Sequence, residues 1–152
     1  MINIPIYVVS VKSFSDRHEH IRRLASKFGF SFEFIFEYDA DELTELDWDR
    51  VGVGLEPNCV STVLKHIECQ RRLIQSDYDI ALVLEDDVVL FEGFAKNLAT
   101  ILAQVSMLEP SWLVFLGGAD DKIDKRFHCS DGLVLVARAI STAEAYLIDR
   151  TG

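Results

Sequence analysis

The stretch IALVLEDDVVL, residues 80–90, decides the fold. Five apolar residues run into three consecutive carboxylates, Glu85, Asp86 and Asp87, and further apolar residues follow. A strand that is buried on both faces reads as a continuous apolar run, and residues 80–84 fit that description. Ligands of open α/β sheets bind beyond the carboxyl ends of the strands. The three carboxylates are therefore predicted at the rim of a sheet, where a ligand site is expected.

Strands and helices alternate on both sides of this stretch. Apolar and alternating segments predict strands over residues 4–11, 30–38, 80–84, 112–116, 133–137 and 145–148. Apolar residues at helical spacing predict helices over residues 15–29, 59–75 and 91–107. The acidic segment 39–57 is predicted to be a long loop, and so is the polar segment 117–132. This order predicts one domain over residues 1–152, an α/β fold with a mostly parallel sheet and helices on both faces.

Helix boundaries and buried faces follow from local signals. Ser15 is predicted as the N-cap of the first helix and Gly29 as its C-terminal stop. Asn58 is predicted to cap the second helix. The spacing of that helix predicts these inward-facing side chains: Val60, Val63, Leu64, Ile67, Leu73 and Ile74.

Composition excludes several classes of protein. The net charge of −10 argues against a nucleic-acid partner, because phosphate binding needs a basic surface. No apolar run approaches the ~18 residues of a membrane span. The start, MINIPIYVVSVKS, reads as a first strand and not as a signal peptide. Three cysteines without a CxxC pair fit a reducing cytoplasm better than a disulfide framework.

The acidic triplet itself predicts a metal site. In an extended segment Glu85 and Asp87 point to one side and Asp86 to the other. Adjacent carboxylates repel unless a cation compensates them, and two oxygen donors on one side suit Mg²⁺ or Mn²⁺. The alternative from the residues alone is a solvated turn between a strand and a helix.

Several segments resemble glycosyltransferase family 25, the bacterial lipopolysaccharide and lipooligosaccharide glycosyltransferases. ALVLEDDVVL resembles the acidic motif of the family, and IYVVSVKSFSDRHEHI resembles its opening strand and arginine-bearing helix. CVSTVLKHIECQRRLIQSDYDIALVLEDDV resembles the helix that leads into the acidic strand, and STAEAYLIDRTG resembles a later segment. The resemblance implies a GT-A-like fold, a UDP-sugar donor and a divalent metal, Mn²⁺ or Mg²⁺.

The resemblance also implies roles for individual residues. Asp87 and Glu85 would be the catalytic residues and metal ligands, with Asp87 on the metal and Glu85 supporting it. Asp86, Arg17 and Ser10 would bind the donor. Ser10 stands where the family usually carries asparagine. From the residues alone, an Arg17 that forms only a surface ion pair stays an alternative.

The expected function is metal-dependent transfer of a hexose, galactose foremost, from a UDP-sugar to a lipooligosaccharide or lipopolysaccharide acceptor. The expected location is the cytoplasm, either free or in peripheral association with the inner face of the bacterial inner membrane. The alternative is a truncated, catalytically inactive nucleotide-sugar-binding module or interaction protein. It rests on the early stop at LIDRTG, where Asp149 reads as an N-cap with no helix behind it.

Overall fold

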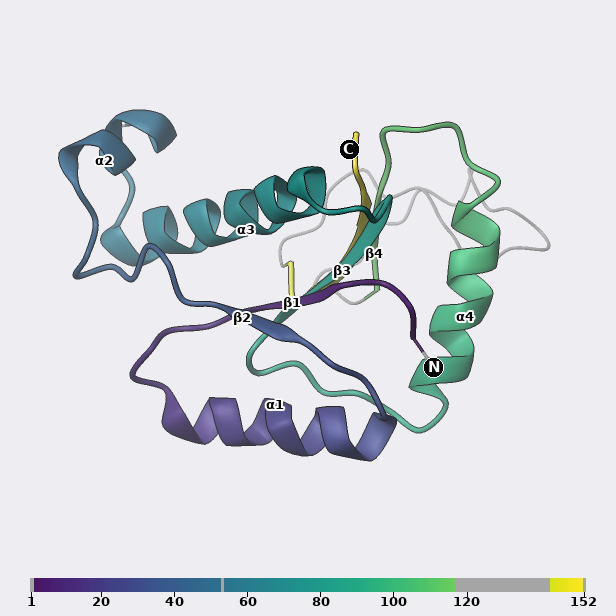
Figure 1. Ribbon diagram of the computed structural model, residues 1–152. Helices are drawn as coiled ribbons and strands as arrows, with labels where there is room; N and C mark the ends of the chain where they lie inside the picture. The colour runs from purple at the N-terminus through teal and green to yellow at the C-terminus, as the bar shows by residue number, and fades with distance from the viewer. Residues whose placement is uncertain (1, 53, 117–142, 152) are drawn as a thin grey trace.

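The computed structural model describes residues 2–52, 54–116 and 143–151, which hold four helices and five strands (Figure 1). In chain order these are β1 (Ile6–Val9), α1 (Ser15–Phe28), β2 (Glu33–Ile35), α2 (Glu45–Val51), α3 (Pro57–Gln75), β3 (Ile80–Glu85), α4 (Phe94–Val105), β4 (Leu113–Phe115) and β5 (Ala145–Asp149). The predicted loop 117–132 and the predicted strand 133–137 lie outside the described residues.

The strands form one mixed sheet in the order β2-β1-β3-β5-β4. β1 pairs in parallel with both β2 and β3, whereas β5 runs antiparallel to both β3 and β4. β4 therefore points the same way as β3, and β5 alone among the five described strands is reversed. The prediction of an α/β fold is confirmed, and the direction of four strands agrees with a mostly parallel sheet. The reversed β5 was not predicted, because an apolar run such as AYLI carries no signal of strand direction.

Helices cover both faces of the sheet (Figure 1). Ile21 of α1 and Leu98 of α4 share one buried cluster with Leu82 of β3. Cys69 of α3 belongs to a second buried cluster, on the other face, with Val83 of β3. Successive side chains of β3 thus enter opposite layers, as they must in a strand. The central strand is buried on both faces, which is why its sequence is apolar throughout.

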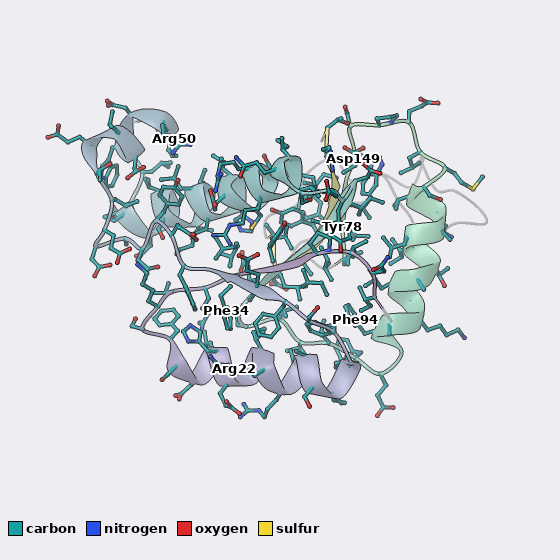
Figure 2. All side chains as sticks on the ribbon, viewed as in Figure 1. Arg22, Phe34, Arg50, Tyr78, Phe94 and Asp149 are labelled. Carbon is teal, nitrogen blue, oxygen red and sulfur yellow. The ribbon has the colours of Figure 1, made fainter. Side chains whose placement is uncertain are left out.

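The alternating phenylalanines Phe30, Phe32 and Phe34 pack against the first of these clusters, the one that contains Ile21 of α1. Phe34 contacts the rings of Phe32 and Phe36, each with a centroid separation of 4.9 Å. Figure 2 shows Phe34 between β2 and α1, and the guanidinium of Arg22 lies 5.9 Å from its ring centroid. Ile35 faces the other layer and is fully buried. The predicted strand over 30–38 is confirmed only for its centre, since β2 spans three residues.

Two predicted helix caps are wrong. The N-cap of α1 is Phe14, and Ser15 is the first helical residue. The N-cap of α3 is Glu56, and Pro57 takes the first turn, where its missing N–H costs nothing. Gly29 ends α1 in the left-handed conformation, φ 70°, as predicted. Proline at the start of a helix was thus a stronger signal than the asparagine that follows it.

The predicted loop 39–57 is also wrong in part, because it contains α2. The helix begins after Thr44, whose backbone N–H donates a 2.9 Å hydrogen bond to the carboxylate of Asp47. This hydrogen bond is one half of a capping box, in which the N-cap residue Thr44 and the third helical residue Asp47 bind each other. The sequence TELD carried that signal, although the acidic composition of the segment masked it.

The buried face of α3 is rotated from the predicted one. Val60, Leu64 and Leu73 are buried as predicted, but Val63, Ile67 and Ile74 are 40%, 38% and 59% exposed. Lys65 and Glu68 take inward positions, and each has a charged partner. The Nζ of Lys65 donates to Asp39 Oδ1 at 2.7 Å, and Glu68 accepts hydrogen bonds from Arg71 and Arg72.

Asp149 is the last residue of β5. Its carboxylate accepts hydrogen bonds from the backbone N–H groups of Ser111 and Thr151, at 2.7 and 2.8 Å. The next residue, Arg150, donates to the carbonyl oxygens of Ser76 and Tyr78 and so ties β5 to the end of α3. Figure 2 shows Tyr78 and Asp149 near the C-terminal end of α3.

Candidate functional site

The acidic triplet begins at the switch point of the sheet. From β1 the chain passes through α1 to β2 on one side, and β3 lies on the other side of β1. Glu85 ends β3 and pairs with Val9, so Ser10 and Asp86 follow at adjacent strand ends. Open α/β sheets bind ligands in the crevice at such a point. Topology therefore supports the predicted location of the site without reference to any family.

Asp86 is turned into the protein and is already partly neutralised. Its carboxylate accepts a 2.6 Å hydrogen bond from Ser10 Oγ and a 2.6 Å hydrogen bond from Arg17 Nη1. Ser10 Oγ also lies 3.1 Å from His18 Nε2. Both Ser10 and Asp86 are buried, and the hydrogen bond to Asp86 raises the pKa of Arg17 above its ordinary value. This arrangement fixes the triplet to β1 and α1.

Glu85 and Asp87 face the other way, into a cleft of about 1000 Å³. The side chain of Glu85 is 29% exposed and that of Asp87 is 53% exposed. The predicted alternation is observed only in part: Glu85 and Asp87 line the cleft and Asp86 is buried, but Asp86 and Asp87 lie in a turn after β3 and not in an extended segment. Arg17 Nη1 also lies 3.1 Å from Asp87 Oδ2, so one guanidinium contacts both aspartates.

The cleft lining combines polar and apolar side chains. Besides Glu85 and Asp87, the polar ones are Thr62, His66, Glu92, Asn97 and Glu144. The apolar lining comes from the β3–α4 loop, from α4 and from the end of β4: Val88, Val89, Leu90, Phe91, Phe94, Leu98, Ile101 and Leu116. The carbonyl oxygen of Val88 lies 2.8 Å from His20 Nε2, which anchors the loop to α1. Val89 and Phe91 are 65% and 78% exposed.

His66 connects the cleft to β5. Its Nδ1 lies 2.9 Å from the hydroxyl oxygen of Tyr146, and its Nε2 lies 3.6 Å from Glu85 Oε1. Within the described residues the buried Nε2 has no hydrogen-bond partner. Burial raises the pKa of Tyr146 far above its ordinary value, so the phenol stays protonated. Sequence reasoning did not link these residues, because the contact depends on the reversed strand β5, which places Tyr146 opposite Val83 of β3.

The cleft carboxylates fit a divalent cation of the Mg²⁺ type. Such ions are held by one or two protein carboxylates together with phosphates and water, and Glu85 and Asp87 supply two. Across residues 2–52, 54–116 and 143–151, no group of three or more histidine, cysteine or acidic side chains is placed to hold a metal. Ser10, Arg17 and Asp86 are not among the cleft-lining residues.

None of the described helices has both the length and the apolar character that crossing a membrane requires.

The comparisons with known proteins give the family. No curated protein matches the chain. The model of glycosyltransferase family 25, described as an LPS biosynthesis protein, matches residues 3–129, which include β1 and the acidic triplet. The chain therefore belongs to glycosyltransferase family 25, a family of lipopolysaccharide biosynthesis.

Proposed function

We propose that this chain is a metal-dependent glycosyltransferase that moves a hexose, galactose foremost, from a UDP-sugar to a lipooligosaccharide or lipopolysaccharide acceptor. The observation that carries the proposal is that Glu85 and Asp87 share one cleft at the carboxyl end of β3. The family supplies the reaction class. The proposal includes two predictions from the sequence. The fold is GT-A-like, and the protein is located in the cytoplasm, either free or at the inner face of the inner membrane.

Asp87 and Glu85 would hold Mn²⁺ or Mg²⁺. The bound cation would neutralise the charge that develops on the departing diphosphate. Asp87 is the more exposed of the two and stands beside Arg17. Glu85 is more enclosed and faces His66, which suits a supporting ligand.

Arg17 lies outside the cleft lining but beside Asp87, and it would contact a diphosphate held there. Both of its hydrogen bonds to Asp86 and Asp87 use Nη1. Within the described part of the chain, Nη2 and Nε make no hydrogen bond, so these donors are available to a phosphate oxygen. Guanidinium groups bind phosphate through such paired donors. Asp86 and Ser10 would then hold Arg17 and the end of β3 in place and would act on the donor indirectly.

The apolar side chains of the cleft lining support the acceptor side of the reaction. Apolar walls exclude water and strengthen the electrostatic interactions of the carboxylates. The exposed Val89 and Phe91 lie on the loop that follows the triplet. We propose that the acceptor saccharide approaches along this loop.

A nucleotide-sugar-binding module without turnover is the second candidate. The observation that favours it is the contact of Arg17 with both Asp86 and Asp87, which already compensates part of the negative charge. A site whose charge is partly compensated by its own chain needs a cation less.

A turnover assay separates the two candidates. Purified protein is incubated with a panel of UDP-hexoses, a lipooligosaccharide acceptor and either Mn²⁺, Mg²⁺ or a chelator, and the released UDP is measured. The proposal expects cation-dependent release with at least one donor, lost in Asp87→Ala. Asp49→Ala changes an exposed aspartate of α2 and serves as the matched control. Binding of UDP without release from any donor would favour the module.

A further inference from the structure

The ring of His66 lies between Tyr146 and Glu85 and has no role in the function proposed above. It extends from α3 over the end of β3, and it is among the residues that line the cleft. Its side chain is only 15% exposed. Its two ring nitrogens have different surroundings, and that difference carries the inference.

Tyr146 fixes the tautomer of the ring. The phenol is buried and protonated, and His66 Nδ1 lies 2.9 Å from its oxygen. A buried phenolic hydroxyl needs an acceptor, and Nδ1 is in hydrogen-bonding range. When Nδ1 accepts this hydrogen bond, the proton of the neutral ring resides on Nε2. The reverse tautomer would turn the lone pair of Nε2 toward a carboxylate, which repels it.

The Nε2–H group lacks a partner at the place where Glu85 stands. The distance of 3.6 Å from Nε2 to Glu85 Oε1 exceeds a hydrogen bond. Within the described residues no other group satisfies this buried nitrogen. A small rotation of the Glu85 side chain, which is 29% exposed, would close the gap.

We propose that His66 is a positioning residue for Glu85, and that its Nε2–H forms a hydrogen bond to Glu85 Oε1 when a cation and the donor diphosphate occupy the cleft. Tyr146 holds the ring in the required tautomer. The chain Tyr146–His66–Glu85 thus orients the supporting carboxylate from behind, as outer partners orient ligands in other metal sites. The inference rests on the proposed function.

Three variants separate positioning from packing. His66→Asn keeps a polar atom near Nδ1 for Tyr146 but has nothing at the position of Nε2. His66→Gln reaches the position of Nε2 with an amide N–H and so restores a donor toward Glu85. Tyr146→Phe keeps the ring packing and removes the hydroxyl. Thermal unfolding of each variant shows that it is folded before it is compared.

The first measurement is a ¹⁵N NMR spectrum of the histidine rings in the free protein, assigned by comparison with His66→Asn. The Nε2–H tautomer is expected for His66. Its replacement by the Nδ1–H tautomer would overturn the inference without any ligand present.

The second measurement is the calorimetric affinity for UDP in the presence of Mg²⁺. His66→Asn is expected to lose about tenfold, His66→Gln to stay within about threefold of the unchanged protein, and Tyr146→Phe to fall between them. If the unchanged protein binds UDP with Mg²⁺ and His66→Asn binds it equally well, the inference alone fails. If the unchanged protein binds no UDP with Mg²⁺, the proposed function fails and the inference falls with it.

Discussion

Arg17 in the first turn of α1 donates a 2.6 Å hydrogen bond to the carboxylate of Asp86, which lies 69 residues later in the chain. The bond joins the helix after the first strand to the acidic triplet after the third. It helps to explain how three adjacent carboxylates are tolerated, because Arg17 compensates the buried Asp86 and also contacts Asp87, while Glu85 and Asp87 line the cleft.

Replacing Arg17 should affect both stability and binding. In Arg17→Ala the buried carboxylate of Asp86 retains only its hydrogen bond from Ser10. The expected loss of unfolding free energy is about 1–2 kcal/mol, because Arg17 is half exposed. Affinity for UDP with Mn²⁺ should fall in the same variant. Urea unfolding and calorimetry measure the two effects.

The matched control for Arg17 is Arg23→Ala, an exposed arginine of the same helix whose nearest carboxylate, Glu19, lies 3.8 Å away. It should change neither quantity. Equal UDP affinity in Arg17→Ala and Arg23→Ala would show that Arg17 is only a structural partner of the aspartates.

The buried ion pair of Lys65 and Asp39 should be important for stability. Lys65→Met leaves the Asp39 carboxylate buried with only the backbone N–H of Lys12 as a partner. Loss of one member of a buried pair costs about 3–5 kcal/mol. Urea unfolding should show this loss, and adding Asp39→Asn to Lys65→Met should restore part of it.

The control for the buried pair is Lys96→Met, which removes an exposed lysine of α4. It should shift the unfolding free energy by less than about 0.5 kcal/mol. Similar effects of Lys65→Met and Lys96→Met would mean that Asp39 does not depend on Lys65.

Stability should fall in acid partly because of Glu68. The hydrogen bond from Arg71 lowers the pKa of this carboxyl below its ordinary value, and the hydrogen bond from Arg72 adds to the effect. Burial acts in the opposite direction but does not outweigh them. A lowered folded pKa contributes stability above the unfolded value, about 4.3, and loses it as the pH falls through the folded value. Glu68→Gln should therefore be less stable at neutral pH and lose less stability on acidification.

The comparison for Glu68 is Glu109→Gln, at an exposed position after α4. Urea unfolding between about pH 7 and about pH 3 should give this variant the same acid dependence as the unchanged protein. An unchanged acid dependence in Glu68→Gln as well would remove Glu68 from the account.

The two described cysteines should differ in reactivity. Burial raises the pKa of the Cys69 thiol to about 12, whereas Cys59 is exposed. The thiolate is the reactive form, so a thiol reagent should label Cys59 in the folded protein and Cys69 only after unfolding. Labelling followed by peptide mass spectrometry, in a Cys129→Ser background, measures this. Equal rates at both sites would show that α3 opens readily.

Much of the fold was predictable because its signals are local. The apolar run before Glu85 identified the central strand, and the change from apolar to acidic residues identified its carboxyl end. The burial of Asp86 between two cleft-lining carboxylates agrees with the predicted alternation, although Asp86 and Asp87 lie in a turn and not in an extended segment. These features depend on neighbours in sequence, and the structure agrees with them.

The features that sequence reasoning missed depend on partners far along the chain. Lys65 was not among the predicted inward-facing residues, because its partner, Asp39, is 26 residues away. The link from His66 to Tyr146 spans 80 residues and requires β5 to run antiparallel. Ser10 and Asp86 were expected to touch the donor, and their mutual hydrogen bond could not be inferred without the strand order.

The central claim is that Asp87, with Glu85, holds a cation and the diphosphate of a sugar nucleotide in the cleft. Calorimetric titration of UDP with and without Mn²⁺, on the unchanged protein, Asp87→Ala and Asp49→Ala, tests it most directly. The account predicts UDP binding that requires Mn²⁺ in the unchanged protein and in Asp49→Ala, and that is lost in Asp87→Ala. Equal binding of UDP by all three proteins with and without Mn²⁺, or no binding by any of them, would contradict it.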